Sequence, residues 1–428
     1  MTRPLTISFH TLGCRLNQAE TATLENRFVA AGYALVTAGE AADVVVINTC
    51  TVTEHGDSDT RRLVNRIRRR RPDTRIALIG CQSQVQAEEL GQLPGVAWVI
   101  GNAVKMNLPE IIHSYHGPGP LILTPEIGRT AFTMEGAAID RHHTRANLKI
   151  QDGCNFSCAY CEIPYARGRS RSREFSDVVR EARELAAAGH REVILTGINI
   201  GTYRHEEKTI IDILAALEAI DELARIRISS IEMTTIPEEI LTFMKNGKVC
   251  RFLHVPVQSG SDPVLKAMQR RHRAGDFADL MHRAVREIPD ICLGTDVMVG
   301  FPGESEQHFE ETHALLQRLP LAYFHVFSYS ERPHSKSRLL GDKVPEAVKA
   351  GRSRALRALS MQKRQAYFHR FIGRSEAVLF EGCKNGLWNG FTDTYIRVRV
   401  AAEAPLHNRI KSVRLLGAEE SSMMGELA

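Results

Sequence analysis

The chain lacks long hydrophobic runs. Over 428 residues, no apolar stretch approaches the ~18 residues that a membrane-spanning helix needs. The N-terminal MTRPLTISFHTLGC also has no apolar signal-peptide core. We therefore expect a cytoplasmic protein without a membrane partner. A hydrophobic content of 43% with 25% charged residues is typical of soluble globular proteins, and the length allows about three domains.

Disulfide bonds are also expected to be absent, because cytosolic thiols stay reduced. The nine cysteines must then serve packing, metal binding or catalysis. Cys250, Cys292 and Cys383 stand alone in strand-like contexts, and we expect each to be buried as a small hydrophobic residue. The other six cysteines form two groups.

The net charge of +5 is modest, but the basic residues are clustered. Residues 61–75 contain eight arginines, residues 166–174 contain four, and residues 352–374 contain seven Lys or Arg and no acid. A single basic run is usually a solvated helix face. Three in one chain favour a polyanionic partner, because clustered cations release counterions from a phosphate backbone.

Residues 1–135 alternate apolar runs with helical segments, which predicts a first domain with an open parallel α/β sheet and helices on both faces. Strands are predicted at 5–14, 43–50, 74–81 and 96–101, with helices at 20–32, 59–71 and 82–93. Cys14, Cys50 and Cys81 each end a predicted strand. Because ligands of such sheets sit at strand carboxyl ends, three parallel strands can present three thiols to one point.

The second predicted domain, residues 136–370, follows a Gly- and Pro-rich stretch at 116–130 that we expect to be less ordered. Six strands, separated by helices, are predicted at 147–154, 191–199, 225–232, 251–260, 291–300 and 323–330. Six β/α units predict an incomplete form of the eight-unit TIM barrel, whose chemistry lies at strand carboxyl ends.

The third predicted domain, residues 371–428, contains the short alternating strands EAVLFEG, GFTDTYIRVRV and RIKSVRLLG, joined by Gly and Asn turns. No helical pattern is visible there. This predicts a small antiparallel β-barrel that ends in a loose tail, GAEESSMMGELA.

The segment GCNFSCAYC places Cys154, Cys158 and Cys161 in a C-x3-C-x2-C spacing after the first strand of the partial barrel. A zinc site would need a fourth ligand, and His142 or His143 is the nearby candidate. Three structural cysteines are the other alternative. A cubane iron–sulfur cluster held by three cysteines leaves one iron open to a further ligand, and the spacing favours this interpretation.

The motif, with Tyr160 before its last cysteine, resembles the signature of the radical S-adenosylmethionine (SAM) superfamily. The strings TLGCRLNQAET, NTCTVTEHGD and LIGCQSQ resemble the amino-terminal domain of its methylthiotransferase family. The similarity continues through CEIPYARGRSRSRE, LTGINIGTY, HVPVQSGSD, TDVMVGFPGE and HVFSYSERP, and GFTDTYIRVRV resembles an RNA-binding TRAM module. The strings ARGRSRSR, LTGINIGTY and ISSIE are most similar to the branch that acts on threonylcarbamoyladenosine in tRNA.

The resemblance implies two [4Fe-4S] clusters and SAM as cofactors. Cys154, Cys158 and Cys161 would hold the radical SAM cluster, and Cys14, Cys50 and Cys81 an auxiliary cluster. One SAM molecule would methylate a sulfide at the auxiliary cluster. A second would be cleaved to a radical that takes hydrogen from adenine C2 at position 37 of the tRNA, where the methylthio group then joins. No catalytic residue beyond the cluster ligands is implied.

The resemblance also implies SAM contacts at the strand ends, although Ser and Gly there also serve as ordinary turn residues. Gly197 and Asn199 would meet the methionine amino group. Ser229, Ser230 and Glu232 are candidates for the ribose. The remaining cofactor-binding candidates are Tyr160, Gln258, Ser259, Asp296 and Gly300.

The implied partners are a tRNA anticodon stem-loop, a sulfur donor and an electron donor such as flavodoxin or ferredoxin. Arg167, Arg169, Arg171 and Arg173 follow the cluster loop and are expected to contact phosphates. The arginine run 61–75 and the C-terminal barrel would hold the stem, unless the barrel is an inert structural cap.

Three other functions stay open. Two are methylthiotransferases, one for isopentenyladenosine in tRNA and one for a ribosomal-protein aspartate. The third is a non-enzymatic iron–sulfur electron carrier. The Gly, Ser and Gln residues at the strand ends argue against a carrier, which needs no site for SAM.

Overall fold

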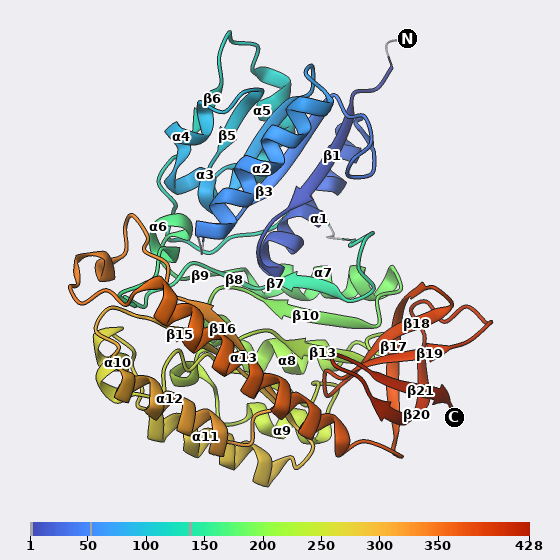
Figure 1. The fold of residues 1–428 in the computed structure, drawn as a ribbon. Helices are drawn as coiled ribbons and strands as arrows, with labels where there is room; N and C mark the ends of the chain where they lie inside the picture. The colour runs from blue at the N-terminus through green and yellow to red at the C-terminus, as the bar shows by residue number, and fades with distance from the viewer. Residues whose placement is uncertain (1–2, 52–53, 137–138) are drawn as a thin grey trace.

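In this computed structural model, which describes residues 3–51, 54–136 and 139–428, the chain forms three successive β-structures (Figure 1). They are an open parallel sheet, a partial barrel of parallel strands and a small closed barrel, as the sequence predicts. Val52 and Thr53, inside the NTCTVTEHGD string, lie outside the described residues. No helix in the described part of the chain is long and apolar enough to cross a membrane.

The N-terminal sheet has six parallel strands in the order β2-β1-β3-β4-β5-β6. The strands are β1 (Thr6–Thr11), β2 (Ala34–Leu35), β3 (Val44–Thr49), β4 (Arg75–Gly80), β5 (Val96–Ile100) and β6 (Leu121–Leu123). The helices are α1 (Arg15–Ala30), α2 (Glu54–Arg70), α3 (Cys81–Val85), α4 (Ala87–Gly91) and α5 (Leu108–Ser114). Every residue of β3 is buried, as expected for a central parallel strand covered on both faces.

Two local predictions in this sheet are wrong. The stretch 116–130 was expected to be less ordered, but it contains β6, whose Leu121 pairs with Trp98 of β5. The helix predicted at 82–93 is two short helices, because the chain breaks at Gln86, which has a non-helical φ of −131°.

The partial barrel has six parallel strands, which Figure 1 shows below the N-terminal sheet. They are β7 (Ala146–Lys149), β10 (Glu192–Thr196), β13 (Arg225–Ile228), β14 (Phe252–His254), β15 (Cys292–Val299) and β16 (Tyr323–Ser328). Two short antiparallel strand pairs accompany them, β8 (Gln151–Asp152) with β9 (Arg171–Ser172) and β11 (Arg204–His205) with β12 (Lys208–Thr209). The helices are α6 (Ile163–Arg167), α7 (Phe175–Ala187), α8 (Ile210–Glu218), α9 (Ile240–Asn246), α10 (Asp262–Ala267), α11 (Ala274–Glu287), α12 (Glu306–Arg318) and α13 (Glu346–His369).

These strands form two three-stranded sheets, β7-β10-β13 and β14-β15-β16. A bridge between Ile226 and Val249 joins them beside β13. No hydrogen bonds pair β7 with β16 among the described residues, so the barrel stays open along that seam. Helix α1 of the N-terminal sheet packs against β7 and β10.

The C-terminal barrel is closed in the order β17-β18-β19-β21-β20, and its strand pairs are antiparallel as predicted except for β19 with β21, which is parallel. Its strands are β17 (Ser375–Lys384), β18 (Leu387–Thr392), β19 (Arg397–Ala401), β20 (Ile410–Ala418) and β21 (Met423–Leu427). The predicted loose tail is wrong, because β21 pairs with both β19 and β20 and closes the barrel. Cys250 and Cys292 are buried as expected, but Cys383 is exposed on β17, contrary to the prediction.

Three arginines of the partial barrel attach the closed barrel to it. Arg225 donates to the carbonyl oxygens of Phe391 and Ala377, at 2.9 and 2.6 Å. Arg251 pairs with Asp393 at 2.6 Å. Arg227 donates to the carbonyl oxygens of Thr392 and Asp393. The turn between β18 and β19 is thereby held against β13 and the residue just before β14 of the partial barrel.

A buried charge network joins the N-terminal sheet to the partial barrel. Glu20 of α1 accepts hydrogen bonds from Arg167 at 3.0 Å and from Lys149 at 2.7 Å, and it also pairs with Lys105. Arg167 further binds Asp152 at 3.1 Å. All five side chains are buried.

The network keeps both carboxylates ionised. Burial by itself would raise the pKa of Glu20, but the neighbouring Arg167, Lys105 and Lys149 hold it well below its usual range. Asp152 responds in the same way to Lys149 and Arg167, and its pKa is lowered. Burial lowers the pKa of Lys105 to about 8, in spite of Glu20 beside it.

We predict that Arg167→Ala lowers the free energy of unfolding by about 3–5 kcal/mol, because it leaves buried carboxylates without their principal partner. Urea denaturation of the anaerobic protein, followed by Trp98 and Trp388 fluorescence, measures this change. The matched control is Arg169→Ala, two residues further on and exposed, which we expect to leave stability unchanged. Equal free energies of unfolding for the two variants would contradict a stabilising role of Arg167 in this network.

Candidate active site between two cysteine groups

The first cysteine group lies at the carboxyl ends of three neighbouring strands. Cys14 precedes α1 after β1, Cys50 follows β3, and Cys81 is the first residue of α3 after β4. The backbone at Gly13 has a φ of +97°, and a Cβ there would lie 2.7 Å from the Cβ of Cys50. Glycine is therefore required for the Cys14 segment to approach Cys50 this closely. Arg167 Nε donates to the Sγ of Cys81 at 3.1 Å.

The second group, Cys154, Cys158 and Cys161, follows β8 in the loop before α6. The three cysteines line a cavity of about 270 Å³ together with Arg169 and His334. Burial raises the pKa of the Cys161 thiol to about 12, so iron would have to displace its proton.

The two histidines considered as zinc ligands contact acidic side chains instead of the second cysteine group. His142 contacts Glu25 at 3.1 Å, and His143 contacts Asp140 at 2.9 Å. Neither histidine is among the residues that line the cavity of the second cysteine group.

Sequence reasoning missed Arg270, which lies behind this group. Its guanidinium donates to Cys158 Sγ at 3.5 Å and to both carboxylate oxygens of Glu232, at 2.9 and 2.5 Å. Its basic run, QRRHR, belongs to no motif that the sequence singles out. Only the fold shows that one member of that run is buried against a cysteine.

A larger cavity of about 710 Å³ connects the first cysteine group with the interior of the partial barrel. Cys14 lines it, and so do four of the predicted cofactor residues, Gly197, Ser229, Ser230 and Asp296. Tyr395 and Arg397 of the closed barrel complete its wall. All three parts of the chain therefore contribute to one pocket.

Two further cofactor candidates, Asn199 and Tyr160, are buried and half-buried, respectively. Asn199 is buried, its Oδ1 accepts a hydrogen bond from Thr235, and its Nδ2 has no partner in the described part of the chain. A buried amide nitrogen without a partner needs a hydrogen-bond acceptor, which a bound ligand would supply. Tyr160 packs between the cysteine loop and Phe301, and burial raises its pKa well above the usual range.

The remaining candidates are occupied by structural contacts. Ser259 is fully buried and bonds Thr312 of α12 at 3.2 Å, so its hydroxyl does not reach the pocket. A Cβ at Gly300 would meet the side chain of Lys349, which makes this glycine a packing requirement. Gln258 has a φ of +70°, and its backbone bonds β15.

The predicted phosphate-binding arginines divide into two kinds. The prediction is wrong for Arg167 and Arg173, since both are fully buried in ion pairs, the latter with Asp177 and Glu181. Arg171 is half-buried and pairs with Asp152 at 3.3 Å. Arg169 is exposed beside the second cysteine group, so its predicted contact with phosphates stays a prediction.

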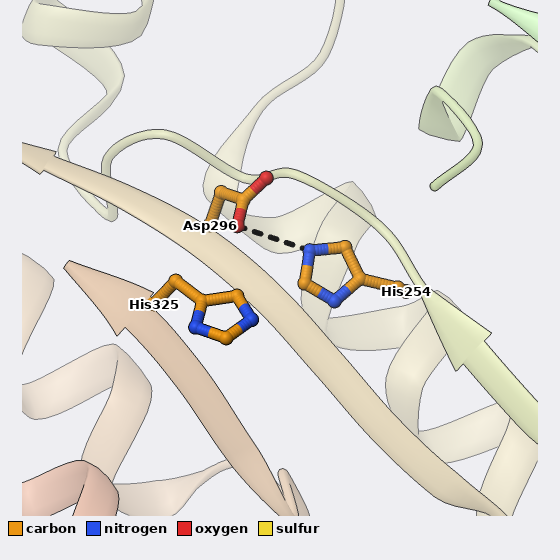
Figure 2. A group of neighbouring side chains, drawn as sticks. All are labelled: His254, Asp296 and His325. Atoms are coloured by element: carbon orange, nitrogen blue, oxygen red, sulfur yellow. Dashed lines mark ion pairs between the residues drawn. The ribbon is translucent and has the colours of Figure 1, made fainter. Parts of the chain in front are cut away.

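Two histidines and an aspartate line the pocket from adjacent strands (Figure 2). His254 of β14 contacts Asp296 of β15 at 3.1 Å through Nε2 and the Tyr323 hydroxyl at 3.0 Å through Nδ1. His325 of β16 is paired in register with Asp296. Burial, reinforced by His254, lowers the pKa of His325 and favours its neutral form. Both ring nitrogens of His254 have partners, so we interpret the group as a hydrogen-bonded wall of the pocket.

Two family models match the chain. One is the radical SAM superfamily, over residues 148–316, and the other is the uncharacterized protein family UPF0004, over residues 6–101. The first range contains Cys154, Cys158 and Cys161, and the second contains Cys14, Cys50 and Cys81. Each model therefore covers one of the two cysteine groups.

The similar proteins of known name are methylthiotransferases. The chain is 36% identical to the threonylcarbamoyladenosine tRNA methylthiotransferase MtaB of Bacillus subtilis, over 96% of this chain and 94% of that one. The enzyme of that name from Aquifex aeolicus is also 36% identical, over 92% and 96% of the two chains. A tRNA-2-methylthio-N(6)-dimethylallyladenosine synthase of Dehalococcoides mccartyi is 31% identical, over 97% of each.

Among solved structures, the radical SAM methyltransferase TsrM from Kitasatospora setae has a similar fold. The TM-score is 0.57 at 16% sequence identity, covering 76% of this chain and 75% of that one. At this identity the likeness supports the fold alone. The identities to the curated enzymes extend over nearly the whole length, and the chain therefore belongs to the radical SAM methylthiotransferase family.

Proposed function

We propose that this protein adds a methylthio group to C2 of N6-threonylcarbamoyladenosine at position 37 of tRNA, next to the anticodon. The relatives at 36% identity carry this substrate in their names, whereas the dimethylallyladenosine enzymes are 31% identical. The structural observation that carries the proposal is the shared pocket. Cys14 of the first cysteine group and the strand-end residues of the partial barrel line the same 710 Å³ cavity.

The residues present fit the cofactors that the family implies. The three cysteines of each group are suited to a [4Fe-4S] cluster, and the unpartnered amide of Asn199 suits a polar ligand at the strand ends. Cys14, Cys50 and Cys81 would hold the auxiliary cluster, and Cys154, Cys158 and Cys161 the radical SAM cluster. When bound, the clusters and SAM supply the radical and methyl-transfer chemistry that acid–base groups cannot perform on an adenine C–H bond.

The protein's own contribution is position and seclusion. Gly197, Ser229 and Ser230 line the pocket where we propose that SAM binds, and Asp296 lines it as well. Glu232 is held by Arg270, so we assign it to positioning the loop of the second cysteine group. A substrate base in this pocket would lie beside Cys14 of the first cysteine group and beside the strand-end residues of the partial barrel, which fixes its position for transfer.

The tRNA would reach the pocket over a basic surface. Arg169 lies at the second cysteine group, and the α2 run carries exposed arginines such as Arg66 and Arg69. We assign residues 1–135 to the auxiliary cluster, 136–370 to radical SAM chemistry and 371–428 to a TRAM-like RNA-binding barrel. An electron donor such as flavodoxin or ferredoxin and a sulfur donor complete the proposed cytoplasmic system.

An electron carrier is the function that this pocket argues against. A carrier exposes a cluster edge and needs no cavity for a nucleotide. Here a cavity runs from Cys14 to the strand-end residues of the partial barrel.

We predict that cells lacking this gene lose 2-methylthio-N6-threonylcarbamoyladenosine from their tRNA. Mass spectrometry of tRNA nucleosides checks this, with complementation by the wild type and by Cys50→Ala, which should fail because it removes a ligand of the auxiliary cluster. Cys383→Ala is the matched control, since this cysteine is exposed on the closed barrel, and it should restore the nucleoside. An unchanged nucleoside in the deletion strain would refute the assigned substrate and direct attention to the dimethylallyl nucleoside.

We also predict that Arg169→Ala weakens binding of an anticodon stem-loop uniformly across sequences. The slope of log Kd against log salt should fall by about one, the signature of a lost phosphate contact. Fluorescence anisotropy at several salt concentrations measures the slope. An unchanged slope would exclude Arg169 from the RNA interface, and Arg318→Gln, on the outer helical face, should leave the slope as it is.

A further inference from the structure

The charge of the large pocket is unbalanced. Arg15, Arg145, Arg227 and Arg397 line it, whereas Asp296 is the single carboxylate residue among the described lining residues. Two of these arginines are neutralised by acids outside the pocket. Arg227 binds Glu192 at 2.7 Å, and Arg145 binds Glu381 at 2.7 Å. The positive charge available to a ligand therefore comes from Arg15 and Arg397.

Arg15 stands immediately next to Cys14 at the start of α1. It is half-buried, and its side chain makes long hydrogen bonds to two neutral groups, Asn147 Oδ1 at 3.5 Å and the Tyr395 hydroxyl at 3.3 Å. It makes no ion pair within the described ranges. Its forked donors remain able to bind a planar anion.

Tyr395 is held in a position that costs conformational energy. Its φ is +62°, in the left-handed region that non-glycine residues avoid, and its ring stacks on Phe391 with centroids 5.3 Å apart. The ring also contacts Phe252 of β14 at 4.5 Å. Such strain persists where the surroundings fix it and is found at ligand sites. Here it brings a hydroxyl from the closed barrel to Arg15.

The two candidate substrates differ in charge at the same position. The threonylcarbamoyl substituent on N6 ends in a carboxylate, whereas the dimethylallyl substituent is a hydrocarbon. In either case C2 of the adenine must lie near the Cys14 group, which brings the N6 substituent close to Arg15. A buried carboxylate without a partner is costly, so a pocket for the first substituent needs a cation and a pocket for the second does not.

We propose that Arg15 binds the carboxylate of the threonylcarbamoyl group, with Tyr395 and Asn147 as positioning residues for its guanidinium. This inference rests on the proposed function and deepens it, since it names the residue that selects the substrate. Arg397, exposed at the rim of the pocket, is not required for the selection.

The test uses the full-length enzyme with both clusters reconstituted anaerobically and two anticodon stem-loops. One carries threonylcarbamoyladenosine, and the other carries the same nucleoside with its carboxyl group converted to a primary amide. The readout is the ratio of kcat/KM for the two RNAs. This ratio is independent of the fraction of active enzyme. It can therefore be compared between variants even when an Arg15 variant loses part of the cluster beside it.

We expect the wild type to prefer the carboxylate by about 10- to 100-fold, the size of one charge-assisted hydrogen-bonded pair. Arg15→Gln should abolish the preference, Arg15→Lys should retain part of it, and Arg318→Gln should keep it whole. An Arg15→Gln enzyme that loses rate equally on both RNAs overturns the inference. The inference is also overturned if the preference for the carboxylate RNA disappears in Arg397→Gln and survives in Arg15→Gln.

Failure of the proposed function gives a different result. Wild-type enzyme that modifies a dimethylallyladenosine stem-loop and neither threonylcarbamoyl RNA would overturn the function and the inference together. Wild-type enzyme that modifies both threonylcarbamoyl RNAs equally well would leave the function standing and refute the role of Arg15 alone.

Discussion

The buried charge network around Glu20 is the constraint on which the site depends. It joins α1 to β7 and α6, and these elements bear or adjoin both cysteine groups. The network contains two carboxylates, on Glu20 and Asp152, and three bases, on Arg167, Lys105 and Lys149. The excess positive charge lies beside Cys81, where Arg167 donates to the sulfur. Because its charges are buried and paired with one another, the junction is intolerant of losing any single member.

The closed barrel has a second role besides any contact with RNA. Its turn between β18 and β19 is held by Arg225, Arg227 and Arg251, and it places Tyr395 and Arg397 in the wall of the pocket. An inert cap would bury apolar surface and leave the pocket to the other two parts. The observed turn instead extends the site, so the barrel and the chemistry are coupled through defined hydrogen bonds.

The sequence predicted the features that depend on local pattern. Apolar runs ending in cysteine located β1, β3 and β4, and because parallel strands share a carboxyl edge, those thiols fall at one edge of the sheet. The local sequence pattern does not predict features that depend on partners far away in the chain. Arg167 looks like a surface residue in its Arg-rich run, but Glu20, far away in sequence, turns it inward. The local pattern predicts a tail at β21, because this short sequence gains strand character only by pairing with β19 and β20.

The open seam of the barrel explains how the N-terminal sheet reaches the interior of the partial barrel. In a complete eight-stranded barrel, side chains fill the interior and loops cover the carboxyl ends. With six strands, β7 and β16 remain unpaired to each other, and α1 packs against β7 and β10. The N-terminal sheet thereby brings Cys14 to the pocket that the strand-end residues line, while the second cysteine group lines a separate cavity. Only the modified base of a macromolecular substrate can enter the partial barrel, and the rest of the stem must stay outside. A lateral opening provides for this arrangement.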